Sequence, residues 1–324
     1  MNRATSERGE IWGLVLAAGE GSRLHGLARR ADGRVAPKQF CALVDERTLL
    51  ATTLERAARL VARRRIVVVV AEEHRRYWES ELADWPRENV VVQPANRGTA
   101  AGLLLPLLHI AGRDPDARVA IFPSDHHVAD ESVFLASVAE ALSALERPLD
   151  RIVLLGIEPD RADTGLGWIA PWPDAIGAPR PVARFVEKPV VDEARELAAA
   201  GALWNSFVLA ARLDALLAVY VRRQPELLDR MTDVVLARRP ERDRDHALAA
   251  LYAALPARDF SRHVLAGNEN ALAVLAVPPC GWSDLGTPER LAECLLARAG
   301  GPRTPPPQRR RPTALRPALE PAFA

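Results

Sequence analysis

Short apolar segments and longer amphipathic segments alternate along the first half of the chain. The apolar segments are rich in β-branched residues, which predicts strands at Gly13–Ala17, Ile66–Ala71, Val90–Gln93, Val119–Phe122 and Ile152–Ile157. Apolar residues at helical spacing fill the intervals, at Leu49–Arg63, Glu73–Leu82, Thr99–Ala111 and Glu131–Leu145. Because several of the strands are apolar throughout, we expect a Rossmann-like α/β fold, a mostly parallel mixed sheet with helices on both faces.

The pattern changes in the second half, where the strands become shorter and proline interrupts them. Strands are predicted at Trp168–Ala170, Val182–Val186, Phe207–Leu209 and Ala271–Val277. Residues 211–265 are predicted to be largely helical, with a break at Pro225. We therefore expect an N-terminal extension (1–10), one main domain (11–299) and a disordered Pro/Arg-rich tail (300–324).

Composition excludes several classes of protein. Lys plus Arg (43) nearly equals Asp plus Glu (42), so no basic field favours nucleic acid as a partner. The longest apolar runs are too short to span a bilayer, and the N-terminus does not resemble a signal peptide. The three cysteines are scattered and odd in number, which favours a reducing compartment. We expect a cytoplasmic protein with no membrane partner.

Lysine is almost absent from the chain. Of the 43 basic residues only two are lysines, Lys38 and Lys188. Arginine can replace lysine on a solvated surface, but its planar fork differs in shape and reach from a compact ammonium beside a phosphate. Both lysines are therefore candidate functional residues.

A glycine-rich turn follows the first predicted strand, with Gly19 and Gly21 before Arg23. A P-loop would require the sequence GK[ST], which this turn lacks. A dinucleotide-binding turn would require a third glycine where Leu24 stands. The third alternative is the A-G-x-G-x-R-L loop of nucleotidyltransferases followed by a Pro-Lys pair, and Pro37-Lys38-Gln39-Phe40 supplies that pair. The combination favours the third alternative.

Further motifs extend this resemblance from Gly13 to Leu291. They are Gln93–Ala100, Phe122-Pro123-Ser124-Asp125-His126, Asp163–Ile169, Phe185-Val186-Glu187-Lys188-Pro189, Trp204-Asn205-Ser206 and Gly281-Trp282-Ser283-Asp284-Leu285-Gly286. In order and spacing they resemble the sugar-phosphate nucleotidyltransferases, most closely the mannose-1-phosphate guanylyltransferases. Both rare lysines fall within matching motifs.

The resemblance implies an enzyme that makes a GDP-sugar, GDP-mannose in the first instance, from GTP and a hexose 1-phosphate with release of pyrophosphate. It implies Arg23, Lys38 and Lys188 as catalytic residues, and Asp125 and Asp284 as ligands of Mg²⁺. The implied nucleotide-binding residues are Ala17, Ala18, Gly19, Gly21, Ser22, Gln93, Arg97, Gly98 and Thr99. The implied sugar-phosphate-binding residues are Gly167, Glu187, Lys188 and Asn205. The expected partners are GTP and the sugar 1-phosphate, and a homodimer is left open.

The residue types suit this chemistry. The reaction brings two polyanions together, so cations must offset their repulsion and stabilise the charge on the leaving pyrophosphate. Carboxylate oxygens are the ligands that Mg²⁺ prefers. Positioning and charge neutralisation supply most of the catalysis, so no covalent nucleophile is required.

Other interpretations compete at single positions. Asp125 could cap the next helix, and His126 with His127 could suggest zinc, although no further His or Cys lies at ligand spacing nearby. Phe207 stands where the family usually has glycine, and the segment around Arg262 lacks the family's aspartate. These departures keep two alternatives open, an enzyme that uses UTP or dTTP and a non-catalytic sugar-nucleotide-binding homologue.

Overall fold

The structure is a computed structural model that describes residues 9–20, 35–146, 151–238 and 240–300. Gly21, Ser22 and Arg23 of the glycine-rich turn lie outside the described residues, as does the predicted tail from residue 301 onward.

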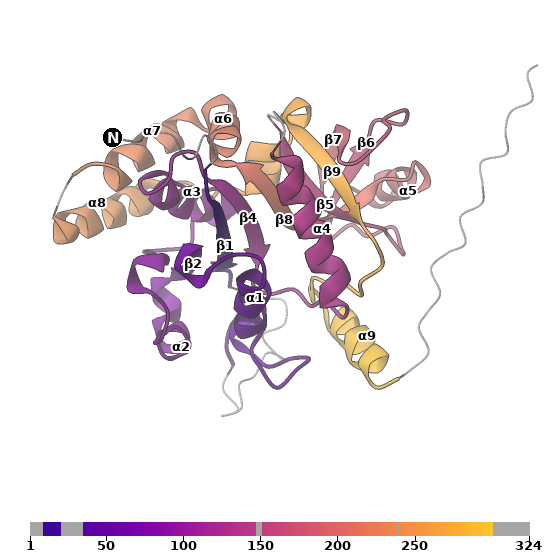
Figure 1. Ribbon diagram of the computed structural model, residues 1–324, viewed down its shortest axis with the longest axis horizontal. Coiled ribbons are helices and arrows are strands. Elements are labelled where there is room, and N and C mark those ends of the chain that lie inside the picture. The colour runs from indigo at the N-terminus through magenta and orange to yellow at the C-terminus, as the bar shows by residue number, and fades with distance from the viewer. Residues whose placement is uncertain (1–8, 21–34, 147–150, 239, 301–324) are drawn as a thin grey trace, which may run out of the picture.

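A nine-stranded mixed sheet forms the centre of the molecule (Figure 1). Its strand order is β3-β2-β1-β4-β8-β5-β9-β7-β6, and β6 also pairs with β8. The strands are β1 (Ile11–Ala17), β2 (Ile66–Ala71), β3 (Val90–Gln93), β4 (Arg118–Pro123), β5 (Ile152–Ile157), β6 (Gly167–Pro171), β7 (Arg180–Glu187), β8 (Leu203–Arg212) and β9 (Leu272–Val277). Neighbouring pairs among β1–β4 and the pair β5–β9 are parallel, whereas β7 and β8 run antiparallel to their neighbours.

Helices cover both faces of the sheet. The helices are α1 (Leu49–Ala58), α2 (Arg75–Glu81), α3 (Gly98–Ala111), α4 (Glu131–Ala144), α5 (Val191–Ala199), α6 (Leu213–Arg223), α7 (Pro225–Val235), α8 (Glu241–Ala254) and α9 (Pro288–Arg298). Side chains of α3, α6, α7 and α8 pack on one face, and those of α1, α2, α4 and α9 pack on the other. Figure 1 shows α6–α8 at one end of the molecule and β6, β7 and α5 at the other. The predicted fold class is confirmed.

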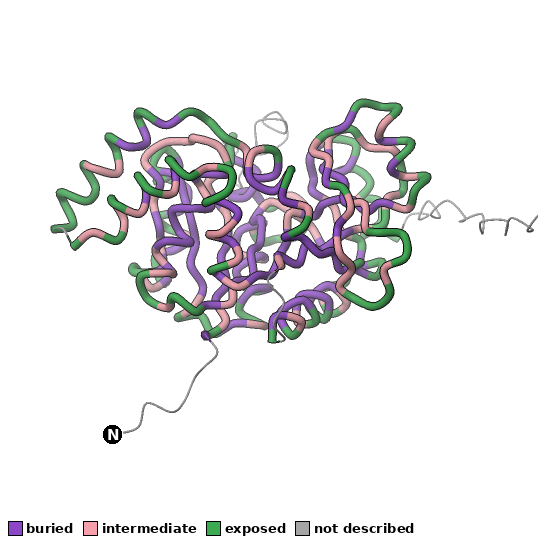
Figure 2. The backbone as a smooth tube through the Cα atoms, turned by 90° about the horizontal axis from the view of Figure 1, so that it is seen from above, coloured by how far each residue is buried: buried purple, intermediate pink, exposed green. Residues whose placement is uncertain are grey.

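Alternation of side chains along each strand divides the core into two layers. Val67 and Val69 of β2 belong to the layer under α3, whereas Val68 and Val70 belong to the layer under α1 and α2. All six residues of β2 are buried, which agrees with an apolar strand covered on both sides. Figure 2 shows this buried centre within a more exposed periphery.

Most predicted boundaries lie within three residues of those in the structure, and two differ by more. The first helix ends at Ala58 rather than Arg63, because the arginines at 63–65 form a separate 3₁₀ turn. The eighth strand begins at Leu203 rather than Phe207, because Trp204 and Asn205 pair with β5 and Trp204 also pairs with β6. The Trp-Asn-Ser motif therefore lies on a strand rather than in a loop.

In the part of the chain that the structure describes, no helix is both long and apolar enough to cross a bilayer.

Gly156 provides a test of the packing where β5, β8 and β9 meet. A Cβ atom at this position would lie 2.6 Å from Leu203 Cδ1 and 2.8 Å from Val274 Cγ2. Gly156→Ala should therefore lower the free energy of unfolding by about 1–3 kcal/mol, the usual cost of overpacking a core. Urea unfolding measures the change. Gly112→Ala is the control, because Gly112 has ordinary helical φ. A Cβ atom there would lie 3.3 Å from Leu236 Cδ2, the end of an exposed side chain that can move. We expect that control to shift stability by no more than about 0.5 kcal/mol. Equal stability of the two variants would contradict this account of the sheet centre.

Candidate active site

Backbone contacts join the ends of three strands at one edge of the sheet. Ser124, which follows β4, donates to the carbonyl of Leu16 in β1 from both its amide (3.1 Å) and its hydroxyl (2.6 Å). His127 and Ser283 exchange two backbone hydrogen bonds of 2.9 Å. These contacts bring the segments that carry Asp125 and Asp284 together, as the parallel strand ends predict.

Lys38 lies buried between those two segments. Its side chain belongs to a short 3₁₀ turn at Lys38–Phe40. Its Nζ lies 3.0 Å from Asp125 Oδ2 and donates a 2.6 Å hydrogen bond to the carbonyl of Asp284. The next residue, Gln39, donates to the carbonyls of Ala17 (3.2 Å) and Gly19 (2.7 Å). The Pro-Lys-Gln-Phe segment thereby connects the start of the glycine-rich turn to both predicted metal ligands.

Asp125 is held in its ionised form. Burial would raise the pKa of its carboxyl, but Lys38 and His126 outweigh that effect and leave the pKa below its usual value. Burial lowers the pKa of His126, whose Nε2 lies 3.5 Å from Asp125 Oδ1. The cap of α4 is Asp130, which accepts hydrogen bonds from the amides of Ser132 and Val133. Asp125 is therefore not a helix cap.

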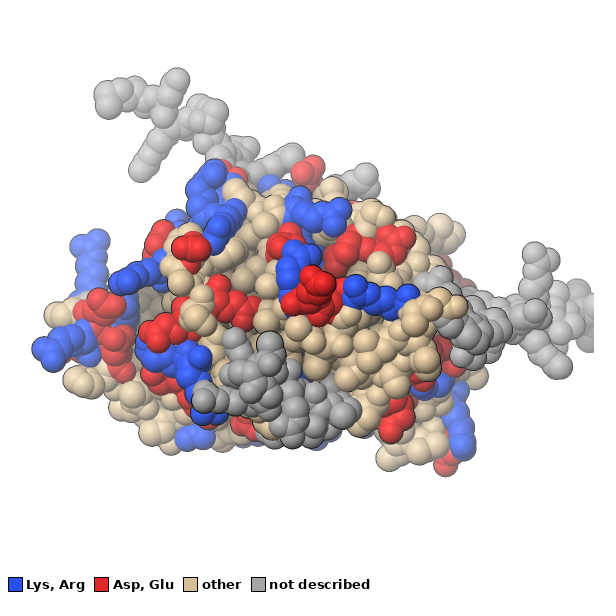
Figure 3. Space-filling view, turned by 90° about the horizontal axis from the view of Figure 1, so that it is seen from below, with Lys and Arg blue, Asp and Glu red and all other residues tan. Residues whose placement is uncertain are grey.

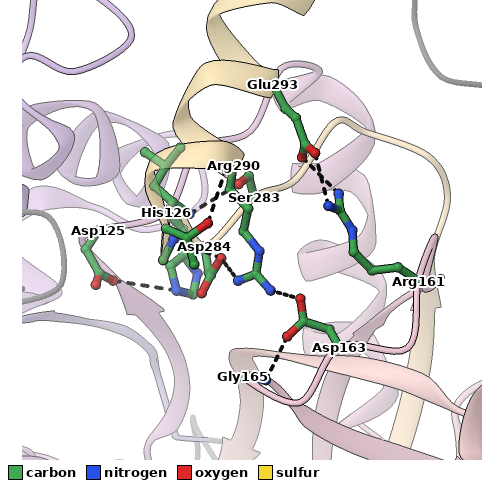
Figure 4. Close-up of polar contacts among 12 residues, drawn as sticks. Asp125, His126, Arg161, Asp163, Gly165, Ser283, Asp284, Arg290 and Glu293 are labelled. Atoms are coloured by element: carbon green, nitrogen blue, oxygen red, sulfur yellow. Dashed lines mark hydrogen bonds and ion pairs between the residues drawn. The ribbon is translucent and has the colours of Figure 1, made fainter. Parts of the chain in front are cut away.

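The Asp284 carboxylate is fixed by two donors. Its Oδ1 accepts a 3.1 Å hydrogen bond from the Gly286 amide and a second hydrogen bond from Arg290 of α9. The other guanidinium nitrogen of Arg290 pairs with Asp163, as Figure 4 shows. Asp284 is 8% exposed, so these contacts define its orientation.

The two aspartates fit a magnesium ion better than a zinc ion. Mg²⁺ is commonly held by one or two carboxylates together with substrate phosphates and water, and Asp125 and Asp284 provide two such carboxylates. Within the described residues, His, Cys, Asp and Glu form no cluster of three that could hold a metal. A closed zinc site at His126 and His127 would require such a cluster.

Gly167, Glu187 and Asn205 lie together at the start of β6. Gly167 pairs with Glu187 in the sheet, and a Cβ at Gly167 would lie 2.6 Å from Glu187 Oε2 and 3.3 Å from the Cβ of Asn205. Asn205 is buried, and its Oδ1 accepts a 3.0 Å hydrogen bond from the Phe207 amide. A side chain at position 167 would displace the Glu187 carboxylate from its present position. The predicted sugar-binding residues are brought together in the structure.

Phe207 keeps the backbone conformation that glycine favours. Its φ is 59°, in the left-handed region. Its ring packs against Phe260 at a centroid distance of 6.1 Å. Phe207 therefore differs from the family's glycine in its side chain but keeps the left-handed backbone conformation.

Lys188 adjoins the same group. Its φ is 53°, and its amide donates a 3.3 Å hydrogen bond to the carbonyl of Leu166. Its Nζ lies 3.3 Å from Glu187 Oε1, and its side chain is half exposed. Unlike Lys38, Lys188 presents its ammonium to solvent, where an incoming phosphate can reach it.

The predicted base-binding segment packs on the helical end of the molecule. Arg97 Nε donates a 2.6 Å hydrogen bond to the carbonyl of Tyr252 in α8, and Gly98 has a φ of 78°. The Thr99 hydroxyl accepts a 2.7 Å hydrogen bond from the Phe260 amide. Gln93 Oε1 is buried without a hydrogen-bond partner among the described residues. The Arg97 guanidinium thus contacts α8, and Gln93 is left with an unused acceptor.

Several residues near these sites did not follow from the sequence motifs. Arg290 follows the Gly-Trp-Ser-Asp-Leu-Gly motif at a spacing that the family pattern does not mark. Asp259 lies close enough to Glu187 for its charge, together with burial, to raise the Glu187 pKa. Asp259 precedes Ser261-Arg262-His263, where the family's aspartate is missing, so a carboxylate from a neighbouring position lies near Glu187.

Figure 3 shows both signs of charge interspersed on the face seen from below.

Comparison with known proteins identifies the class. A solved structure titled mannose-1-phosphate geranyltransferase, from Thermus thermophilus, is similar with a TM-score of 0.72 and 30% identity, covering 85% of this chain and 76% of that chain. The strand order and the site place the protein among transferases with a nucleotide-diphospho-sugar fold. The model of the Nucleotidyl transferase family matches residues 12–299, and the chain belongs to that family.

Two curated relatives are similar over most of the chain. The Escherichia coli K12 mannose-1-phosphate guanylyltransferase is 30% identical over 301 residues, which cover 90% of this chain and 61% of the relative. The alginate biosynthesis protein AlgA of Pseudomonas fluorescens is 31% identical over 281 residues, which cover 84% of this chain and 56% of the relative. The chain thus spans less than two thirds of the length of these relatives.

The buried Glu187 carboxylate should lower the stability of the fold at neutral pH. Burial and Asp259 raise its pKa above the unfolded value, so its contribution to stability is present at acid pH and is lost as pH rises through the folded-state pKa. Glu187→Gln should therefore raise the melting temperature at pH 7, and the gain should shrink towards pH 4. Thermal melts at both pH values measure this.

The control for Glu187→Gln is Glu193→Gln on α5. Glu193 pairs with the exposed Arg184, and surface pairs of this kind contribute about 0–1 kcal/mol. This change should not raise the melting temperature at either pH. A Glu187→Gln variant that melts below the parent protein at pH 7 would show that the carboxylate is better compensated than its surroundings indicate.

Proposed function

We propose that this protein transfers GMP from GTP to mannose 1-phosphate and releases pyrophosphate. The observation that carries the proposal is the position of Lys38 between Asp125 and Asp284, within a chain of the nucleotidyl transferase family. The names of its curated relatives support guanine and mannose as the specific substrates. An oxygen of the sugar phosphate attacks the α-phosphorus of GTP, the bond to the β-phosphate breaks, and pyrophosphate leaves.

Cations of the chain offset the charge in this reaction. Lys38 is fixed by Asp125 and by the Asp284 carbonyl, so it can stabilise phosphate charge without first becoming ordered. Lys188 has an exposed ammonium suited to the phosphate of the sugar. Arg23 is assigned to the triphosphate from the sequence motif alone. Glu187 and Asn205 supply acceptors and a donor for sugar hydroxyls.

Magnesium would be held by Asp125 and Asp284. When bound, the ion supplies positive charge between the phosphates and helps to orient them. Lys38 pairs with Asp125 and Arg290 pairs with Asp284, so both carboxylates are oriented before the ion arrives. Oxygen donors and a set of only two protein ligands agree with the usual preferences of Mg²⁺.

Guanine selection is assigned to the segment that follows β3. Gln93 Oε1 is buried without a hydrogen-bond partner among the described residues and can accept a hydrogen bond from a base. Arg97 and Thr99 are held by contacts with α8 and Phe260. A base with a different edge leaves such groups unpaired, which weakens its binding strongly.

The substrate assignment predicts the outcome of a pyrophosphate-release screen. Four nucleoside triphosphates are each combined with a panel of sugar 1-phosphates in the presence of Mg²⁺. We expect the highest kcat/KM for GTP with mannose 1-phosphate. A preference for UTP or dTTP would overturn the guanylyl assignment and leave the family intact. Binding of a GDP-sugar with no turnover of any pair would indicate a non-catalytic homologue.

Removal of either metal-ligand charge should abolish efficient turnover. Asp125→Asn and Asp284→Asn keep the size of the side chain and delete its charge, so we expect kcat to fall about 100-fold or more. The Mg²⁺ concentration for half-maximal rate should rise in both variants. Steady-state kinetics across a Mg²⁺ titration provides the measurement. Asp130→Asn is the matched control, because asparagine caps a helix about as well as aspartate. Normal turnover in either variant would remove that residue from the mechanism.

A further inference from the structure

Arg290 connects two parts of the site that lie far apart in the sequence. It belongs to the first turn of α9 and is 8% exposed. One guanidinium nitrogen pairs with Asp284, a proposed metal ligand, and the other pairs with Asp163 (Figure 4). Burial would lower the pKa of Arg290, but the two carboxylates outweigh it and keep the side chain charged.

Asp163 begins the segment that leads into the sugar pocket. Its Oδ1 accepts a 2.7 Å hydrogen bond from the Gly165 amide, and its carbonyl accepts a 2.8 Å hydrogen bond from Trp168 Nε1. The carbonyl of Leu166 in turn accepts the Lys188 amide at 3.3 Å. The position of Asp163 therefore influences both Gly167, which borders Glu187, and the backbone of Lys188.

We propose that Arg290 is a positioning residue that locks the 163–167 segment to the Asp284 carboxylate, so that the sugar pocket and the metal ligand keep one relative position. Arg290 acts through these two carboxylates and needs no contact with substrate. The proposal rests on the function proposed above and adds a specific structural requirement for sugar-phosphate binding.

The bridge between Asp163 and Asp284 requires an arginine side chain. Its planar fork can pair with two carboxylates at once in fixed directions, whereas a lysine ammonium offers a single point of charge on a flexible stem. Arg290→Lys should therefore keep a cation beside Asp284 but lose the bridge to Asp163. Asp163→Asn should lose the same bridge from the other side, because the amide carries no negative charge to pair with Arg290. Its oxygen can still accept the hydrogen bond from the Gly165 amide.

A second ion pair joins the same two elements and provides a matched control. Arg161, two residues before Asp163, pairs with Glu293 of α9 at 2.8 Å, three residues after Arg290. Both side chains of that pair are about half exposed, and neither contacts Asp284 in the structure. Arg161→Gln thus removes a cross-link between the same elements and leaves the Asp163–Arg290–Asp284 bridge intact.

The test compares Arg290→Met, Arg290→Lys, Asp163→Asn and Arg161→Gln by steady-state kinetics. For Arg290→Met we expect KM for mannose 1-phosphate to rise about tenfold or more and kcat to fall, because both carboxylates lose their partner. Asp163→Asn and Arg290→Lys should reproduce the rise in KM with a smaller effect on kcat. KM for GTP should change less than twofold in Asp163→Asn and Arg290→Lys, which keep a cation beside Asp284, and Arg161→Gln should match the parent protein in every constant. The double variant Arg290→Met/Asp163→Asn should raise the sugar KM no further than Arg290→Met alone.

Amide hydrogen exchange without substrate gives a readout independent of turnover. Exchange in peptides that cover residues 163–168 should increase in Arg290→Met, Arg290→Lys and Asp163→Asn but not in Arg161→Gln. Unchanged exchange in these three variants, or increased exchange with an unchanged KM for mannose 1-phosphate, would overturn the proposal. If the parent protein uses another sugar 1-phosphate, the same constants are measured with that substrate. If the parent protein turns over no sugar 1-phosphate, the proposed function fails. In that case unchanged hydrogen exchange in the three variants would refute the positioning role of Arg290, and increased exchange would support it. Melting temperatures of all variants separate a loss of positioning from a loss of fold, and Asp163→Asn and Arg290→Lys decide the question if Arg290→Met does not fold.

Discussion

The site depends on the compensation of carboxylates that the fold gathers at one edge of the sheet. Asp125, Asp284 and Asp163 approach this edge from three segments, and carboxylates in such proximity repel one another unless cations lie between them. Lys38 compensates Asp125, and Arg290 compensates Asp284 and Asp163. Local compensation of these charges lowers the electrostatic cost of bringing the strand ends together.

The two cations differ because their tasks differ. Lys38 must reach one carboxylate and one backbone carbonyl in a narrow buried space, which a compact ammonium with rotatable donors can do. Arg290 must hold two carboxylates in fixed directions, which suits a planar fork. In a chain that uses lysine only twice, the lysine at position 38 therefore marks a geometric requirement rather than a need for charge alone.

The sequence was sufficient to predict the fold class and the proximity of Asp125 and Asp284, because hydrophobic periodicity predicts strands and parallel strands share a carboxyl edge. It was insufficient for contacts set by side-chain reach. The Arg290–Asp163 pair joins residues 127 positions apart, and no periodicity signals it. The start of α4, in contrast, agrees with the predicted boundary at Glu131, and Asp130 rather than Asp125 caps the helix. The left-handed backbone at Phe207 lies where the register between β8 and β5 shifts, and a phenylalanine in the sequence does not indicate such a conformation.

Charge balance also explains why such a site would need additional cations when substrates bind. The group formed by Lys38, Arg290, Asp125, Asp284 and Asp163 has one more carboxylate than cations. Glu187 and Asp259 add negative charge at the sugar pocket, which Lys188 and Arg262 offset only in part. Such surroundings suit hydroxyl groups but oppose two phosphates at once, since like charges in a partly dehydrated site repel strongly. Asp125 and Asp284 would hold a divalent ion that adds positive charge beside the phosphates, and Glu187 would remain available for the sugar. With the proposed function, this charge balance would make phosphate binding depend on the metal and would link binding of the nucleotide to occupation of the metal site.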